Sequence, residues 1–158
     1  MVVQGPEVKA FEDEFCEVTG SAHCVAVNSG TSALQLGLIA LGIGPGDEVI
    51  VPSFTFAASA NAIKLVGAEP VFVDIEPGSF CLDPAAVRAA IGPKTAAIMP
   101  VHLYGHPADM TAINEIAKAH NLLVLEDAAQ AHGAAIDGKP VGGLGDAGAF
   151  SFYPTKNM

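Results

Sequence analysis

Three short polar segments carry the side chains of this sequence that could do chemistry together. Ser29–Ser32 combines hydroxyl groups with a glycine, Glu126–Gln130 carries two carboxylates, and Ser151–Lys156 ends in a lysine. A glycine lets the backbone approach a ligand closely, and the free amides of a helix N-terminus bind phosphate. A carboxylate can pair with a cationic ring nitrogen, and a lysine amine can form an imine.

Each of these segments also has a purely structural explanation. Ser29–Ser32 is equally typical of a helix N-cap. The carboxylates of Glu126–Gln130 could cap a helix or belong to a buried ion pair. Lys156 could be an ordinary solvated lysine, or a desolvated amine whose lowered pKa suits imine chemistry. Their order along the chain favours the functional explanation over the structural one, because a phosphate turn, an aromatic segment, an acid and a lysine follow one another.

The elements between these segments alternate between strands and helices. Short apolar runs predict strands at 23–27, 48–51, 70–73, 95–101, 122–126 and 147–152. Helices are predicted at 6–18, 55–66, 84–91 and 108–120, and around Leu34, Leu38 and Leu41. This alternation predicts one α/β domain over 1–158, with a mostly parallel sheet between two helical layers. Ligands bind beyond the carboxyl ends of the strands in such sheets, which is where the polar segments fall.

Composition and charge exclude several classes of protein. The chain is 51% hydrophobic and 15% charged, with a formal net charge of −10, so a compact globular domain is expected. Seven Lys and Arg residues are too few for a basic stripe, so neither nucleic-acid nor membrane-surface binding is expected. No apolar run approaches the roughly 20 residues of a membrane span, and the first residues do not resemble a signal peptide. With three widely spaced cysteines, a cytoplasmic location is predicted.

Six motifs, in order along the chain, make a more specific statement. They are SGTSAL at 29–34, GPGDEV at 44–49, PSFTF at 52–56, PVHLYG at 100–105, EDAAQAHG at 126–133 and FSFYPTKN at 150–157. Together they resemble the DegT/DnrJ/EryC1/StrS sugar aminotransferases, which are fold-type I pyridoxal-phosphate enzymes. The resemblance covers nearly the whole chain. It implies the large domain of a fold-type I transferase, truncated at its C-terminal side.

The resemblance also implies roles for residues at matching positions. Lys156 matches the catalytic lysine that forms the Schiff base with pyridoxal phosphate, and Asp127 matches the acid that pairs with the pyridine nitrogen. Gln130 lies at the position near the phenolic oxygen of the ring, and Phe56 matches the aromatic residue that stacks on it. The residues implied to bind the cofactor phosphate are Gly30, Thr31, Ser32 and Ser151.

The implied reaction is amino transfer from an amino acid, glutamate being the expected donor, to a nucleotide-linked keto-sugar. One alternative is a sugar dehydratase of the same family, in which histidine replaces the lysine, so Lys156 favours amino transfer. Another is a truncated or regulatory chain that binds pyridoxal phosphate without turnover. Because the family is longer, has a second, smaller C-terminal domain and works as a homodimer, residues 1–158 are expected to be an inactive, poorly stable fragment.

Two further patterns favour structural explanations. The spaced glycines of Gly143–Gly148 fit a dinucleotide-binding pattern, but they precede a strand rather than follow one, so a tight loop is expected. His102 and His106 have the spacing of helical metal ligands, but glycine and proline make their segment a loop, so no metal site is predicted. His132, near the proposed cofactor acid, is expected to be a hydrogen-bonded core histidine.

Overall fold

A five-stranded parallel sheet forms the centre of the molecule in the computed structural model, which describes residues 5–156. The strands lie in the order β2-β1-β3-β4-β7, and every neighbouring pair is parallel. Their bounds are β1 (Glu48–Pro52), β2 (Glu69–Val73), β3 (Thr95–Ile98), β4 (Leu123–Asp127) and β7 (Ala147–Ala149). The helices are α1 (Pro6–Thr19), α2 (Gly30–Ala40), α3 (Ala58–Leu65), α4 (Pro84–Ala90) and α5 (Met110–His120), with a 3-10 turn at Leu103–Gly105.

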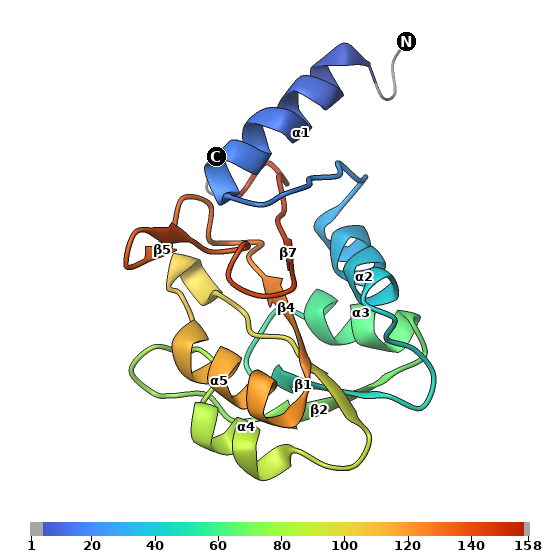
Figure 1. Cartoon of the computed structure of the whole chain (residues 1–158), viewed down its shortest axis with the longest axis vertical. Coiled ribbons are helices and arrows are strands. Elements are labelled where there is room, and N and C mark those ends of the chain that lie inside the picture. Colours follow the sequence, from blue (N-terminus) through green and yellow to red (C-terminus); the bar gives the residue numbers. More distant parts are fainter. Residues whose placement is uncertain (1–4, 157–158) are drawn as a thin grey trace.

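Helices cover both faces of this sheet (Figure 1). On one face, Leu38 of α2 and Ile63 of α3 pack in a core that includes Val49 and Val51 of β1. On the other face, helices α4 and α5 cover a core that includes Ile50. Successive side chains of a strand point to opposite faces, so the Val49–Val51 run fills both cores at once. The predicted three-layer α/β fold with a parallel sheet is confirmed.

Local signals in the sequence set several of the helix ends. Ser29 caps α2 by accepting a hydrogen bond from the Ser32 amide, and Asp83 caps α4, which has proline in its first turn. Asp109 caps α5, which ends at Asn121 in the left-handed conformation. Polar side chains that accept from free amides, and residues that tolerate a positive φ, are common at these positions.

The structure differs from the predicted elements at several places, one of which is the strand predicted at 95–101, which ends at Ile98. Residues 23–27 form no strand: the Ala26 amide donates to Glu12 Oε1 of α1 at 2.8 Å, and Val25 is 75% exposed. An apolar run becomes a strand only if a neighbour supplies a hydrogen-bonding edge, and this run has none among residues 5–156. Strand β7 ends at Ala149 rather than at 152, because β4 offers no further partner. A small hairpin of β5 (Ala135–Ile136) and β6 (Lys139–Pro140) was not predicted.

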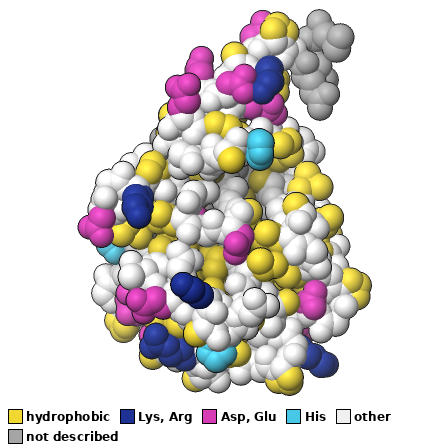
Figure 2. Space-filling view, in the orientation of Figure 1, with side chains coloured by type: hydrophobic (Ala, Val, Ile, Leu, Met, Phe, Trp, Pro, Cys, Tyr) yellow, Lys and Arg dark blue, Asp and Glu magenta, His cyan; other side chains and the backbone are white. Residues whose placement is uncertain are grey.

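Helix α1 lies over the segment that follows β7. Phe11 and Phe15 of α1 contact Phe150 and Phe152, with ring centroids 4.9 to 5.3 Å apart between the two segments. The outer surface of α1 is acidic, as the magenta side chains at the top of Figure 2 show. This helix therefore joins the two ends of the described chain through an aromatic cluster.

Within residues 5–156, no helix has both the length and the apolar character needed to cross a bilayer. All three cysteines are free, and Cys81 is buried.

Candidate functional site

A large cavity opens at the carboxyl ends of the strands. It has a volume of about 1550 Å³ and is lined by residues from the start of α2, the loop after β1, the end of β4 and the segment after β7. Seven of the eight predicted cofactor residues line it: Gly30, Thr31, Phe56, Asp127, Gln130, Ser151 and Lys156. Ser32 is not among the lining residues, and Asn157 of the last motif lies outside the described residues. The fold thus brings together segments that are up to 126 positions apart, from Gly30 to Lys156.

Asp127 is the buried acid of this cavity, at the end of β4. Its side chain is largely enclosed, the residue being 5% exposed. Oδ2 accepts a hydrogen bond from Ser59 Oγ at 2.7 Å, and Oδ1 accepts one from the Ala129 amide at 3.2 Å. Burial raises the pKa of Asp127, and the two hydrogen bonds and the positive charge of Lys156 oppose this rise. A cationic partner in the cavity would therefore stabilise the ionised form of Asp127.

Ser59 is a part of the site that the sequence analysis missed. It lies on the inward face of α3 and is fully buried, with its Oγ 3.0 Å from Thr55 Oγ1. Because Ser59 donates to Asp127, Thr55 can complete a chain of hydroxyl groups that leads to the carboxylate. The one available signal was a serine on an apolar helix face, which is too common to indicate a site.

The start of α2 and the segment after β7 meet at the predicted phosphate turn. Ser29 Oγ accepts from the Ser32 amide at 3.1 Å and lies 2.9 Å from Ser32 Oγ, so the N-cap explanation holds for this pair. The amides of Gly30 and Thr31 make no hydrogen bond with another described residue. A Cβ on Gly30 would lie 2.8 Å from the Cβ of Ser151, so glycine allows this close approach. The result is a helix N-terminus with free amides beside a serine hydroxyl, which suits an anion.

The remaining predicted residues lie around the same cavity. Phe56 is 69% exposed, and Lys156 is half-buried in a turn in which its amide donates to the Tyr153 carbonyl. Gln130 Oε1 accepts a hydrogen bond from the Tyr104 amide at 2.8 Å, and Tyr104 has a left-handed φ of 55°. This hydrogen bond links Gln130, which follows β4, to the 3-10 turn that contains Tyr104.

His132 does not match its predicted role. Its ring packs against Phe150 and Phe152, with centroids 5.4 and 5.0 Å away. Neither ring nitrogen has a hydrogen-bond partner among the described residues, so the prediction of a hydrogen-bonded core histidine is wrong. Burial and the charge of Lys156 lower the pKa of His132, although the Ser151 backbone lies near enough to oppose the shift. The aromatic packing favours a neutral imidazole.

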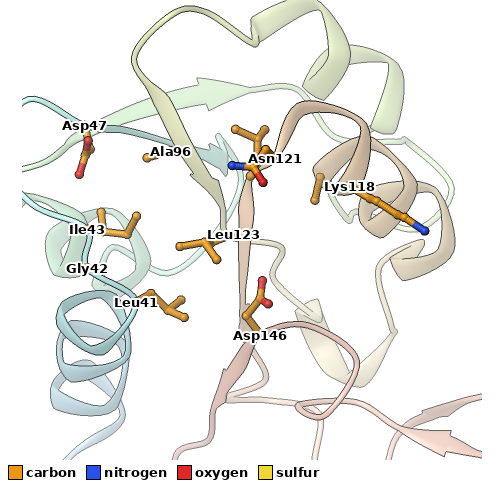
Figure 3. A pocket seen from close by; sticks show the side chains of 11 residues that line it. Leu41, Gly42, Ile43, Asp47, Ala96, Lys118, Asn121, Leu123 and Asp146 are labelled. Atoms are coloured by element: carbon orange, nitrogen blue, oxygen red, sulfur yellow. The ribbon is translucent and has the colours of Figure 1, made fainter.

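A second, smaller cavity of about 570 Å³ lies at the opposite, amino end of the strands (Figure 3). Its carboxylates already bind backbone amides, Asp47 that of Gly44 and Asp146 that of Val124. Lys118 extends away from the other labelled side chains (Figure 3). Within the described part of the chain, no cluster of three or more His, Cys, Asp or Glu side chains could hold a metal ion. The groups suited to chemistry therefore gather at the carboxyl end of the sheet.

Comparison with known proteins identifies the family. The profile of the DegT/DnrJ/EryC1/StrS aminotransferase family matches residues 1–158. The chain belongs to this family. It is 54% identical over 156 residues to the UDP-N-acetyl-3-dehydro-alpha-D-glucosamine 3-aminotransferase of Acidithiobacillus ferrooxidans, covering 99% of this chain and 42% of that protein.

Solved structures of family members have the same fold. The structure of DesV from S. venezuelae in complex with a ketimine intermediate is 54% identical, with a TM-score of 0.93, over 98% of this chain and 42% of that one. The structure of NtdA from Bacillus subtilis with bound cofactor PMP is 43% identical, with a TM-score of 0.83, over 88% of this chain and 32% of that one. The chain thus spans about two fifths of the length of the curated relative and of DesV.

Proposed function

We propose that this protein is a pyridoxal-phosphate-dependent aminotransferase that moves an amino group from an amino acid, glutamate being the expected donor, to a nucleotide-linked keto-sugar. The observation that carries the proposal is the cavity at the carboxyl ends of the strands. There, a buried carboxylate, a helix N-terminus with free amides and a lysine lie around one space. Membership of an aminotransferase family and similarity to an enzyme named for a UDP-linked keto-sugar support it.

The residues around the cavity fit the chemical groups of this cofactor. Asp127 is a buried acid without full compensation of its charge, and a protonated ring nitrogen would supply that compensation. The free amides of Gly30 and Thr31, with the hydroxyl of Ser151, would hold the phosphate. Phe56 offers an exposed aromatic face for stacking on the ring. Relatives with bound PMP, the aminated form of the cofactor, agree with this assignment.

When bound, pyridoxal phosphate supplies an aldehyde and an electron-accepting ring. The ionised Asp127 would keep the ring nitrogen protonated, and Ser59 would hold the carboxylate in place. The Lys156 amine would bind the aldehyde and, once displaced by the substrate amine, move a proton between the substrate carbon and the cofactor carbon. The presence of Lys156 favours amino transfer over dehydration, since the dehydratases of this family are expected to have histidine there.

We further propose that residues 1–158 belong to the large domain of a longer polypeptide with a second, smaller domain. The proposal is supported by the relative lengths, because this chain covers 42% of the curated enzyme. A homodimer and a cytoplasmic location are part of the same proposal. Sequencing of the whole gene, followed by analytical ultracentrifugation of its product, tests the length and the oligomeric state.

The cofactor assignment is tested with the complete gene product and pyridoxal phosphate. Borohydride reduction followed by peptide mass spectrometry should locate a phosphopyridoxyl group on Lys156, and Lys156→Ala should lose it. Lys139→Ala is a matched control, since Lys139 is exposed on β6. A reducible adduct that persists in Lys156→Ala contradicts the assignment. With a keto-sugar nucleotide, consumption of one glutamate per product indicates amino transfer, whereas its absence indicates dehydration.

A further inference from the structure

Glu126, the neighbour of the cofactor acid, is a fully buried carboxylate that the proposed chemistry does not use. Its Oε1 accepts hydrogen bonds from the amides of Leu144 and Gly145, both at 2.7 Å. Its Oε2 accepts from the Gly142 amide at 2.7 Å and from His102 Nε2 at 2.9 Å. Two donors at each oxygen use the full acceptor capacity of a carboxylate. Glu126 is thus a completely satisfied buried anion.

The negative charge of this pair lies on Glu126. His102 is fully buried, and its Nδ1 accepts a hydrogen bond from the Ala108 amide at 3.0 Å. Because that nitrogen must be unprotonated, Nε2 carries the hydrogen that reaches Glu126, and the imidazole is neutral. Burial alone would raise the pKa of Glu126, but the hydrogen bonds from His102, Gly142 and Gly145 outweigh burial and lower it.

The loop that binds Glu126 contains two of the three glycines that fit a dinucleotide pattern, Gly143 and Gly145, whereas the third, Gly148, lies in β7. Gly142 has a φ of 85°, and a Cβ there would overlap the ring of Phe150. A Cβ on Gly143 would lie 2.6 Å from the Thr19 carbonyl oxygen at the end of α1. The loop therefore packs closely between α1 and the segment after β7, and a side chain at position 142 or 143 would clash with these neighbours. Its amides bind the chain's own carboxylate, rather than a phosphate of a dinucleotide.

The Glu126 loop leads directly into the proposed cofactor site. Glu126 pairs with Gly148, and Asp127 with Ala149, in the register of β4 and β7. The chain then continues into Ser151–Lys156, which lines the cavity. The position of the loop consequently determines where β7 begins and how the segment after it is placed relative to Asp127.

We propose that Glu126 is a positioning residue: its buried carboxylate, held by His102, binds the amides of the 142–145 loop and thereby places Ser151 and Lys156 opposite Asp127. Glu126 itself touches neither cofactor nor substrate. The expected effect on cofactor binding rests on the proposed function, whereas the expected effect on the loop does not. Two measurements therefore distinguish a failure of the positioning proposal from a failure of the proposed function.

The first measurement is amide hydrogen exchange of the cofactor-free complete gene product, with and without Glu126→Gln. The NH₂ group of the new glutamine would face two N–H donors at either oxygen position, where it cannot accept a hydrogen bond. His102 cannot turn Nε2 into an acceptor, because its Nδ1 must accept from the Ala108 amide. Exchange at the amides of Gly142, Leu144 and Gly145 should become at least about tenfold faster relative to the amides of β1. Unchanged protection at these three amides, or equal loss in β1, would overturn the proposal.

His102→Asn is a milder second variant, in case Glu126→Gln does not fold. Asparagine can still accept from the Ala108 amide with its Oδ1, but it is too short to replace the donor at Glu126 Oε2. Three of the four donors to Glu126 remain. Loop exchange should therefore accelerate by a smaller factor than in Glu126→Gln, and protection identical to that of the unmodified protein contradicts the role of His102.

The second measurement is cofactor binding by the same variants. The Kd for pyridoxal phosphate should rise by roughly tenfold in Glu126→Gln, and the pH at which the bound cofactor's visible band titrates should shift. The control for general destabilisation is Val87→Ala in α4, a helix that packs on β2 and α5, and this variant should leave both quantities unchanged. Equal cofactor affinity and an equal titration in Glu126→Gln refute positioning. If the unmodified protein does not bind pyridoxal phosphate, the proposed function is refuted. The hydrogen-exchange result for the 142–145 loop would still be valid in that case.

Discussion

The hydroxyl of Ser59 offers a direct test of how the buried acid is stabilised. Ser59→Ala removes one oxygen from a fully buried position and leaves almost the same volume, so packing changes little. It removes the 2.7 Å hydrogen bond to Asp127 Oδ2 and the 3.0 Å hydrogen bond with Thr55 Oγ1, of which only the first involves the carboxylate. That bond opposes the effect of burial on the carboxylate, so the pKa of Asp127 should rise further in the variant.

The expected magnitude depends on the ionisation of Asp127. A hydrogen bond to a charged group contributes about 1.5–3 kcal/mol, and one between neutral groups about 0.5–1.5 kcal/mol. The free energy of unfolding should therefore fall by about 1.5–3 kcal/mol when Asp127 is ionised, and by about 0.5–1.5 kcal/mol when it is protonated. Because the loss is larger for the ionised form, the pKa of Asp127 should be higher in the variant than in the unmodified protein.

The sign of the pH dependence follows from the raised pKa. Between the ordinary Asp value and the folded value, the folded state binds more protons than the unfolded state, so Asp127 lowers stability as pH rises through that window. Ser59→Ala raises the pKa of Asp127 in the folded state and so extends this pH range upward. The loss in free energy of unfolding is therefore largest at pH values above that pKa, where Asp127 is ionised, and becomes smaller as the pH falls below it.

Urea unfolding of cofactor-free protein over a pH series measures this cost. Ser79→Ala is the matched control, because Ser79 donates to a carboxylate of Glu76 at 3.3 Å at the exposed surface. Ser79 Oγ also accepts from the Cys81 amide, so its effect is an upper limit for an exposed serine–carboxylate bond. A Ser59→Ala cost below about 0.5 kcal/mol at neutral pH, or one that is independent of pH, would refute the reasoning.

Three further changes have defined outcomes. Asp127→Asn should raise the free energy of unfolding of the cofactor-free protein at neutral pH and make that free energy less dependent on pH, which urea unfolding at two pH values measures. The same variant should bind the cofactor more weakly in a binding titration. Asp109→Ala should lower the free energy of unfolding by about 0.5–2 kcal/mol, because the cap on the Ala112 amide is lost; no change in the urea midpoint would contradict this. Phe56→Ala should leave stability within about 0.5 kcal/mol, since the side chain is exposed, but should weaken pyridoxal phosphate binding by roughly 2- to 10-fold in a fluorescence titration. Equal cofactor affinity would remove Phe56 from the site.

Much of the architecture was predictable because it depends on residues that are near one another in the sequence. The Val49–Val51 run is apolar without a break, which indicates a strand buried on both faces. Ser29 and Asp109 mark helix starts by their residue type. The order of the polar segments, together with the parallel sheet that the alternation implies, was enough to predict that they meet at one end of the sheet.

The predictions failed where an outcome depends on a distant partner. Residues 23–27 have the composition of a strand but form their hydrogen bond with Glu12 of α1 instead. His132 carries two polar nitrogens that suggest a hydrogen bond, yet Phe150 and Phe152 surround its ring. In both cases the local pattern was clear, but the packing around it decided the result.

The sequence by itself thus determined most of the strands and helices, the fold class and the meeting of the polar segments at the carboxyl ends of the strands. Only the tertiary structure decided which groups stabilise the two adjacent carboxylates. Ser59 reaches Asp127 across 68 positions, and the 142–145 amides reach Glu126 across 16 to 19. Such contacts exist only after the sheet has assembled, because a buried charge binds whichever donors the packed backbone places beside it.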